Sequence, residues 1–171
     1  MRGRVLLIIG ALATLAFLAT AVLGYRLTSG ATDPGVPNHL LIGLASVLMM
    51  LFSHCWVLIY LVSTGGAVRE AVREQGVDAS FDEASRLLRR RAIPLAVGAT
   101  VVGFATFLLG AAVVPNLVPA WIHHALFYAT VLAQGLALWT EGRVLGENEK
   151  LLADVDRRLT PSTLEPVPHA G

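Results

Sequence analysis

Four histidines lie in long apolar stretches of this sequence, and their side chains are the ones best suited to hold a metal cofactor there. His39 and His54 belong to one stretch, and His123 and His124 belong to another. A neutral imidazole offers a nitrogen lone pair to iron or to a transition metal without adding net charge to an apolar environment. We therefore expect any bound cofactor to be held by these residues.

The spacing of the histidines predicts one shared site. Along a helix that rises about 1.5 Å per residue, His54 lies roughly 22 Å from His39. If both stretches are helices that start at the same membrane surface, His39 lies at the depth of His123 and His124. His54 then has no histidine at its own depth. We predict a site between His39 and the second pair, with His54 as a second site or a proton-relay group.

Only one of His123 and His124 is expected to point at the other stretch, because consecutive residues diverge by about 100° on a helix. His123 shares its helix face with Gln134 and Glu141. The face of His124 contains Gly135, whose missing side chain leaves room for a flat ring. We therefore favour His124 as the ligand, with His123 as its substitute.

Histidines on two helices of a bundle resemble the arrangement in membrane cytochromes of the b type. The resemblance covers only the two histidine-containing stretches, and no family motif is matched. It implies a haem b, with His39 and His124 as axial ligands, and exchange of electrons with a quinone or another membrane redox subunit. The sequence has no Cys-x-x-Cys-His motif, so covalent attachment of haem is excluded.

Two other interpretations of the histidines stay open. The neighbouring residues Met49, Met50, His54 and Cys55 include the soft sulfur ligands that Cu(I) prefers. Alternatively, the histidines are structural, and His54 forms a hydrogen bond to Ser53 or to a backbone carbonyl group in the core.

The composition requires that much of the surface faces lipid. Hydrophobic residues make up 55% of the 171 residues and charged residues 15%, whereas a soluble domain carries about 25% charged residues. A membrane-spanning helix needs about 20 apolar residues. Four stretches without Asp, Glu, Lys or Arg satisfy this: residues 5–24, 39–62, 92–114 and 119–139. We predict an all-α membrane protein, a four-helix transmembrane bundle that forms one domain over residues 1–159.

Basic residues predict how the bundle is oriented. Twelve of the 13 Lys and Arg residues fall at the N-terminus, in residues 64–91 or after the fourth stretch, and Arg26 alone falls on the other side. Basic residues concentrate in cytoplasmic segments, so we expect a multi-pass protein of the plasma (inner) membrane with both termini in the cytoplasm. Residues 64–91 and 141–159 should form cytoplasmic helices, and residues 160–171 a disordered tail.

Two further expectations concern individual residues. Ser80 and Glu83 have the spacing of a capping box at a helix start. Asp and Glu lie only in the predicted loops and tails, so no buried carboxylate pair is expected. We expect no internal repeat.

These features limit the possible functions. A net charge of +1 argues against nucleic-acid binding, and hydrolase and phosphate-binding motifs are absent from the sequence. The favoured function is a small b-haem or metal-binding redox protein in the membrane. The alternative is a non-catalytic accessory subunit that helps to organise a larger membrane complex. Either can form a homo- or hetero-oligomer, and both have membrane lipid as a partner.

Overall fold

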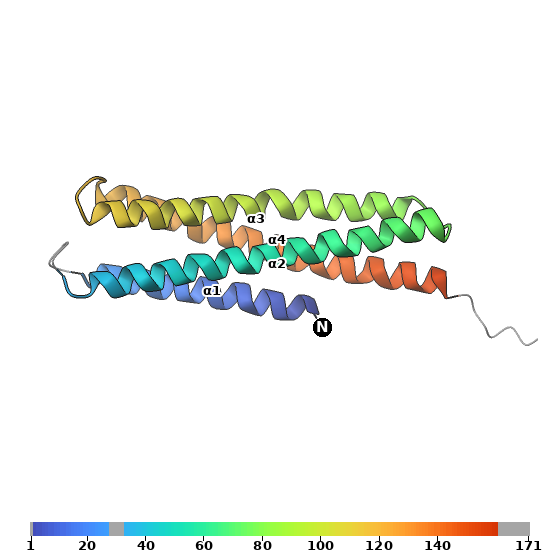
Figure 1. Ribbon diagram of the computed structural model, residues 1–171, viewed down its shortest axis with the longest axis horizontal. Coiled ribbons are helices and arrows are strands. Elements are labelled where there is room, and N and C mark those ends of the chain that lie inside the picture. Colours follow the sequence, from blue (N-terminus) through green and yellow to red (C-terminus); the bar gives the residue numbers. More distant parts are fainter. Residues whose placement is uncertain (1, 28–32, 161–171) are drawn as a thin grey trace, which may run out of the picture.

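The protein is a bundle of four long α-helices (Figure 1). The computed structural model describes residues 2–27 and 33–160, and their side chains from residue 5 onward. The helices are α1 (Arg2–Tyr25), α2 (Val36–Glu74), α3 (Ser80–Val113) and α4 (Ala120–Leu159). Figure 1 shows the α1–α2 and α3–α4 connections at one end of the bundle and the α2–α3 connection at the other. The described part of the chain is thus all-α, as predicted.

Three of the helices are long and apolar enough to cross a membrane. They provide the segments Val5–Tyr25, Val36–Glu74 and Ser80–Val113. Helix α4 does not reach the same mean hydropathy, so the predicted four-span arrangement is supported for three helices only.

Helix α4 is less apolar because its interior face is polar. Its outward-facing side chains Leu132, Leu136 and Trp139 are large, apolar and exposed. The polar residues of the same helix are buried against the other helices: Thr130, Gln134, Glu141 and Asn148. The stretch from Thr130 to Glu141 therefore exposes large apolar side chains and buries polar ones, the reverse of a helix on a soluble protein.

The predicted helical extensions beyond the apolar stretches are present. Helix α2 continues to Glu74 and is followed by Gly76 at φ 71°, a backbone conformation that favours glycine. Helix α4 runs without a break through both of the segments predicted for it, 119–139 and 141–159. A separate apolar cluster that includes Val68, Val77 and Val155 joins α2 and α4 at this end. Of the tail predicted over residues 160–171, all but Thr160 lies outside the described residues.

The predicted capping box at the start of α3 is not formed. Neither Ser80 nor Glu83 caps the helix through its side chain, and the N-cap position is Ala79. The backbone N–H of Ser80 instead donates to Asp78 Oδ1 at 2.7 Å. Asp78 replaces the predicted cap because its short carboxylate reaches the N–H group two residues ahead.

The two hairpins α1–α2 and α3–α4 share several residues at equivalent positions, although no internal repeat was expected from the sequence. Seven residues of α1 recur in α3 exactly 86 positions later: Arg4, Ala13, Thr14, Ala19, Thr20, Leu23 and Gly24 correspond to Arg90, Ala99, Thr100, Ala105, Thr106, Leu109 and Gly110. Six residues of α2 recur in α4, 84 positions later: His39, Ala45, Val47, Leu48, Leu61 and Arg73 correspond to His123, Ala129, Val131, Leu132, Leu145 and Arg157.

The hydrogen bonds of the two hairpins correspond as well. The hydroxyl groups of Thr20 and Ser46 are 3.3 Å apart in the first hairpin, and those of Thr106 and Thr130 are 2.6 Å apart in the second. The packing is related but not equal, because α2 contacts α3 more extensively than α4 contacts α1. The bundle therefore consists of two similar hairpins packed together.

The cap at the start of α3 gives a first prediction. Asp78→Ala should speed amide hydrogen exchange in the first turn of α3, because the N–H of Ser80 loses its acceptor. Ser80→Ala is the comparison variant and should accelerate exchange less, because the backbone N–H of Ser80 keeps Asp78 as its acceptor. Faster exchange in Ser80→Ala than in Asp78→Ala would show that the Ser80 side chain, and not Asp78, caps the helix.

Candidate cofactor site and a buried ion pair

His39 and His123 are held in the same way by the helix that precedes each of them. His39 Nδ1 lies 3.0 Å from the backbone oxygen of Thr20, and His123 Nδ1 lies 3.0 Å from that of Thr106. A carbonyl oxygen can only accept, so each Nδ1 carries the hydrogen and donates it. In a neutral ring the lone pair is then on Nε2, which has no hydrogen-bond partner among the described residues.

A glycine makes room for each of these rings. An added Cβ on Gly24 would lie 2.7 Å from Cε1 of His39, and one on Gly110 would lie 2.6 Å from Cε1 of His123. Real Cβ atoms do not approach other heavy atoms this closely. Each imidazole therefore fits against the neighbouring helix only because a glycine faces it.

The two equivalent rings meet between α2 and α4. Their centroids are 6.5 Å apart, and their planes are nearly perpendicular, at 89°. They line a small cavity of about 40 Å³ together with apolar side chains such as Phe17 and Phe107. A larger cavity of about 390 Å³ adjoins it at the end of the bundle where both hairpins turn, and His39, His123 and His124 all line it.

His124 points in a different direction from His123. Its ring lies 5.2 Å from that of Tyr25, whose hydroxyl group is 3.1 Å from the hydroxyl group of Tyr128. The structure thus places His39, His123 and His124 around one space, as the depth argument requires, with His123 as the neighbour of His39. The geometry favours His123 over His124 as the partner of His39.

Among residues 5–27 and 33–160, no group of three or more His, Cys, Asp and Glu side chains could hold a bare metal ion. The copper cluster suggested by the sequence does not converge, because Met49 and Cys55 are exposed whereas Met50 and His54 are buried.

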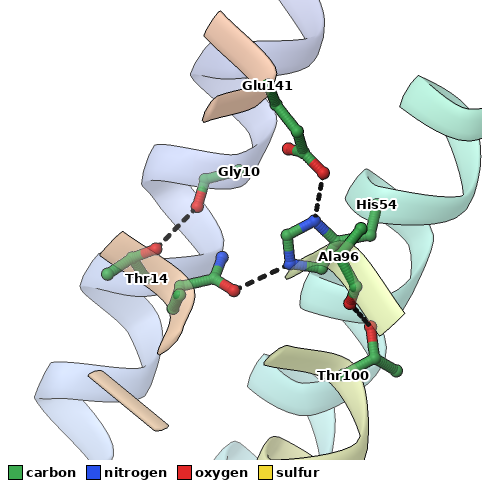
Figure 2. A network of polar contacts seen from close by, with 7 residues as sticks. Gly10, Thr14, His54, Ala96, Thr100 and Glu141 are labelled. Carbon is green, nitrogen blue, oxygen red and sulfur yellow. Dashed lines mark hydrogen bonds and ion pairs between the residues drawn. The ribbon is translucent and has the colours of Figure 1, made fainter. Parts of the chain in front are cut away.

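His54 lies deeper in the bundle and is part of a second polar site (Figure 2). Its Nδ1 is 2.7 Å from Glu141 Oε1, and its Nε2 is 2.8 Å from Gln134 Oε1. The exposed fractions of the three residues are 1% for His54, 0% for Glu141 and 1% for Gln134. His54 is therefore hydrogen-bonded across the bundle to α4, and not to Ser53 or a backbone carbonyl group.

Glu141 corrects the expectation that carboxylates occur only in loops and tails. It was assigned to a cytoplasmic helix because a charged residue normally ends a membrane span. Here the hydrogen bond with His54 gives the carboxylate a partner and lets it enter the core. The sequence did contain a signal, since Glu141 follows Gln134 by seven residues and so shares its interior face.

The three residues of this network have apolar counterparts in the repeat. Gln134 and Glu141 of α4 correspond to Met50 and Val57 of α2, and His54 corresponds to Leu138. Val57 is fully buried, like Glu141. The same bundle thus accepts apolar side chains at equivalent positions, so packing alone does not require the polar network.

Comparison with protein-family models, curated proteins and solved structures gave no match for this chain. The function must therefore be argued from the two sites themselves.

The repeat allows a direct test of whether the fold needs the buried network. Glu141→Val should lower the stability of the protein by about 3 kcal/mol, because it leaves His54 buried without its charged partner. The triple variant His54→Leu, Gln134→Met and Glu141→Val carries the counterpart residue at each position and should restore stability to the native level or above. Thermal unfolding in detergent measures both. A triple variant as unstable as the single one would mean that the fold itself depends on the network.

Proposed function

We propose that all four helices cross the membrane and that the protein binds a haem b for electron transfer. The proposal for α4 rests on residues 120–140, which contain no Asp, Glu, Lys or Arg. At about 1.5 Å per residue this segment is roughly 31 Å long, enough for a bilayer core of about 30 Å. Most of its exposed side chains are apolar, such as Leu132, Leu136 and Trp139, whereas Thr130 and Gln134 are buried, which suits a helix that faces lipid outward and a cofactor inward.

The same proposal places the α2–α3 connection and both termini in the cytoplasm. This orientation follows from the twelve basic residues on that side against Arg26 on the other. The histidine pair His39 and His123 then lies near the outer surface of the plasma membrane.

The observation that carries the haem proposal is the paired geometry of His39 and His123. Two imidazoles that share one metal ion, at about 2.0 Å per nitrogen–metal bond, have ring centroids roughly 6 to 7 Å apart. The observed separation is 6.5 Å. Each Nδ1–H is held by a carbonyl oxygen, an arrangement that orients a metal-ligating histidine and makes its other nitrogen more basic.

This hydrogen-bond pattern favours a metal over a quinone as the group that both rings contact. A quinone oxygen needs a hydrogen-bond donor, and in a neutral ring the only N–H group is already bound to the backbone. The Nε2 lone pairs of His39 and His123 suit iron, and these two residues would hold a haem. The iron would supply the redox chemistry, whereas Thr20 and Thr106 would fix the ring orientations. A quinone or another membrane redox subunit is then the electron partner at the outer cavity.

The proposal predicts a specific set of absorption spectra. The full chain, purified in detergent and incubated with haemin, should show a Soret band and, on reduction, a sharp α band. His39→Ala and His123→Ala should each abolish the α band, because one axial ligand is lost. His124→Ala is the matched control and should leave the spectrum nearly unchanged. If His124→Ala abolishes the band and His123→Ala does not, His124 is the ligand.

The glycines that accommodate the rings supply a second control in the same experiment. Gly110→Ala places a methyl group 2.6 Å from His123 and should displace the ring and weaken haem binding. Gly98→Ala lies on the same helix with no neighbouring atom within 4 Å and should have no effect. A native chain that gives no haem spectrum would refute the proposal and favour the accessory-subunit interpretation.

A further inference from the structure

The network of His54, Gln134 and Glu141 has a chemistry that differs from that of the outer histidine pair. Both nitrogens of the His54 ring face oxygen atoms, Glu141 Oε1 on one side and Gln134 Oε1 on the other. Oxygen acceptors at both nitrogens are satisfied only when the ring carries two hydrogens. The arrangement therefore matches an imidazolium–carboxylate ion pair with no net charge.

No other ionisable side chain faces the pair in the described structure. Around it, α1 contributes Gly10 and Thr14, and α3 contributes Ala96 and Thr100 (Figure 2). The next charged residue of α4, Arg143, is exposed. The protonation of His54 is thus governed by Glu141 and by the amide of Gln134.

The amide group of Gln134 can form a hydrogen bond to the His54 ring in either protonation state of the ring. An amide group presents an acceptor oxygen and a donor nitrogen, and turning it exchanges the two. With the oxygen toward the ring, the amide accepts from a protonated Nε2. With the nitrogen toward the ring, it donates to a deprotonated Nε2. Gln134 Nε2 now has no hydrogen-bond partner in the described structure, and neither has Glu141 Oε2.

We propose that His54, Gln134 and Glu141 form a buried proton-binding site. One proton binds at His54 Nε2 and forms a hydrogen bond to Gln134 Oε1, which gives the neutral imidazolium–carboxylate pair. Release of that proton leaves a neutral ring beside the Glu141 carboxylate, and the amide of Gln134 turns to donate to Nε2. The apolar counterparts Met50, Val57 and Leu138 in the repeat show that the bundle supports this position without such chemistry.

The site stands apart from the proposed haem site. His54 is roughly 22 Å from the level of His39 by helical rise, and its partners contact neither His39 nor His123. The inference therefore holds whether or not the protein binds haem, and its test needs no cofactor.

Nuclear magnetic resonance of the full chain, labelled with ¹⁵N-histidine and reconstituted in lipid nanodiscs, tests the proposal. The signals of His54 are assigned by their loss in the triple variant His54→Leu, Gln134→Met and Glu141→Val. Near neutral pH both ring nitrogens of His54 should be protonated, and raising the pH toward about 9 should remove the proton from Nε2 while Nδ1 keeps its own.

Substitutions then identify the groups that hold the proton. Glu141→Gln removes the carboxylate charge and should weaken proton binding at Nε2 at least tenfold, so that the proton leaves at lower pH, and Glu141→Asp should restore much of it. A wild-type ring that carries a single proton at Nδ1 from about pH 5 to pH 9 would overturn the proposal. A titration that Glu141→Gln leaves unchanged would overturn it too. If Glu141→Gln does not fold, the wild-type titration alone decides.

Discussion

The hydrogen bond from each histidine of the outer pair to a backbone carbonyl group is the interaction on which the proposed haem site depends. A helical carbonyl oxygen already accepts one hydrogen bond within its helix, and its second lone pair is reachable only where no side chain covers it. Gly24 and Gly110, each four residues after the accepting threonine, leave that approach open. The glycine, the carbonyl group and the imidazole therefore form one structural unit. It occurs as Gly24, Thr20 and His39 in the first hairpin and as Gly110, Thr106 and His123 in the second. Because the unit occurs once in each hairpin, the two rings come together between α2 and α4.

Comparison of the two hairpins distinguishes the polar groups that occur in both from those that occur in only one. Hydroxyl pairs and small residues recur in both hairpins, and they satisfy polar groups and allow close helix packing. The network of His54, Gln134 and Glu141 does not recur. A buried ion pair is costly to desolvate, and apolar side chains of similar size are often equally stable or more so. A polar network at a position where the other hairpin is apolar is therefore better explained by chemistry than by stability. Ionisable residues inside a membrane bundle are functional candidates for the same reason.

Much of the architecture could be predicted from the sequence. The four apolar stretches gave the four helices, and the helical rise placed His39 level with His123 and His124. The choice between His123 and His124 could not be made, because it depends on the rotation of α4, which is fixed by the contact of His123 with Gly110. The burial of Glu141 was not predicted, because a charged residue normally ends a membrane span. This rule fails when the charged residue has a buried partner such as His54. The repeat was missed because small and apolar residues fill all four stretches and hide the few positions that correspond.

The central claim is that α4 crosses the membrane beside α2 with its polar face inward, since only then can His123 meet His39 inside the bundle. Reporter fusions after Val118 and after Thr160 test this most directly, with a fusion after Gln75 as a reference. The account predicts that the fusion after Val118 reads outside the cytoplasm, whereas those after Gln75 and Thr160 read inside. Fusions after Val118 and Thr160 that read on the same side would show that α4 does not cross, and the paired site would be contradicted.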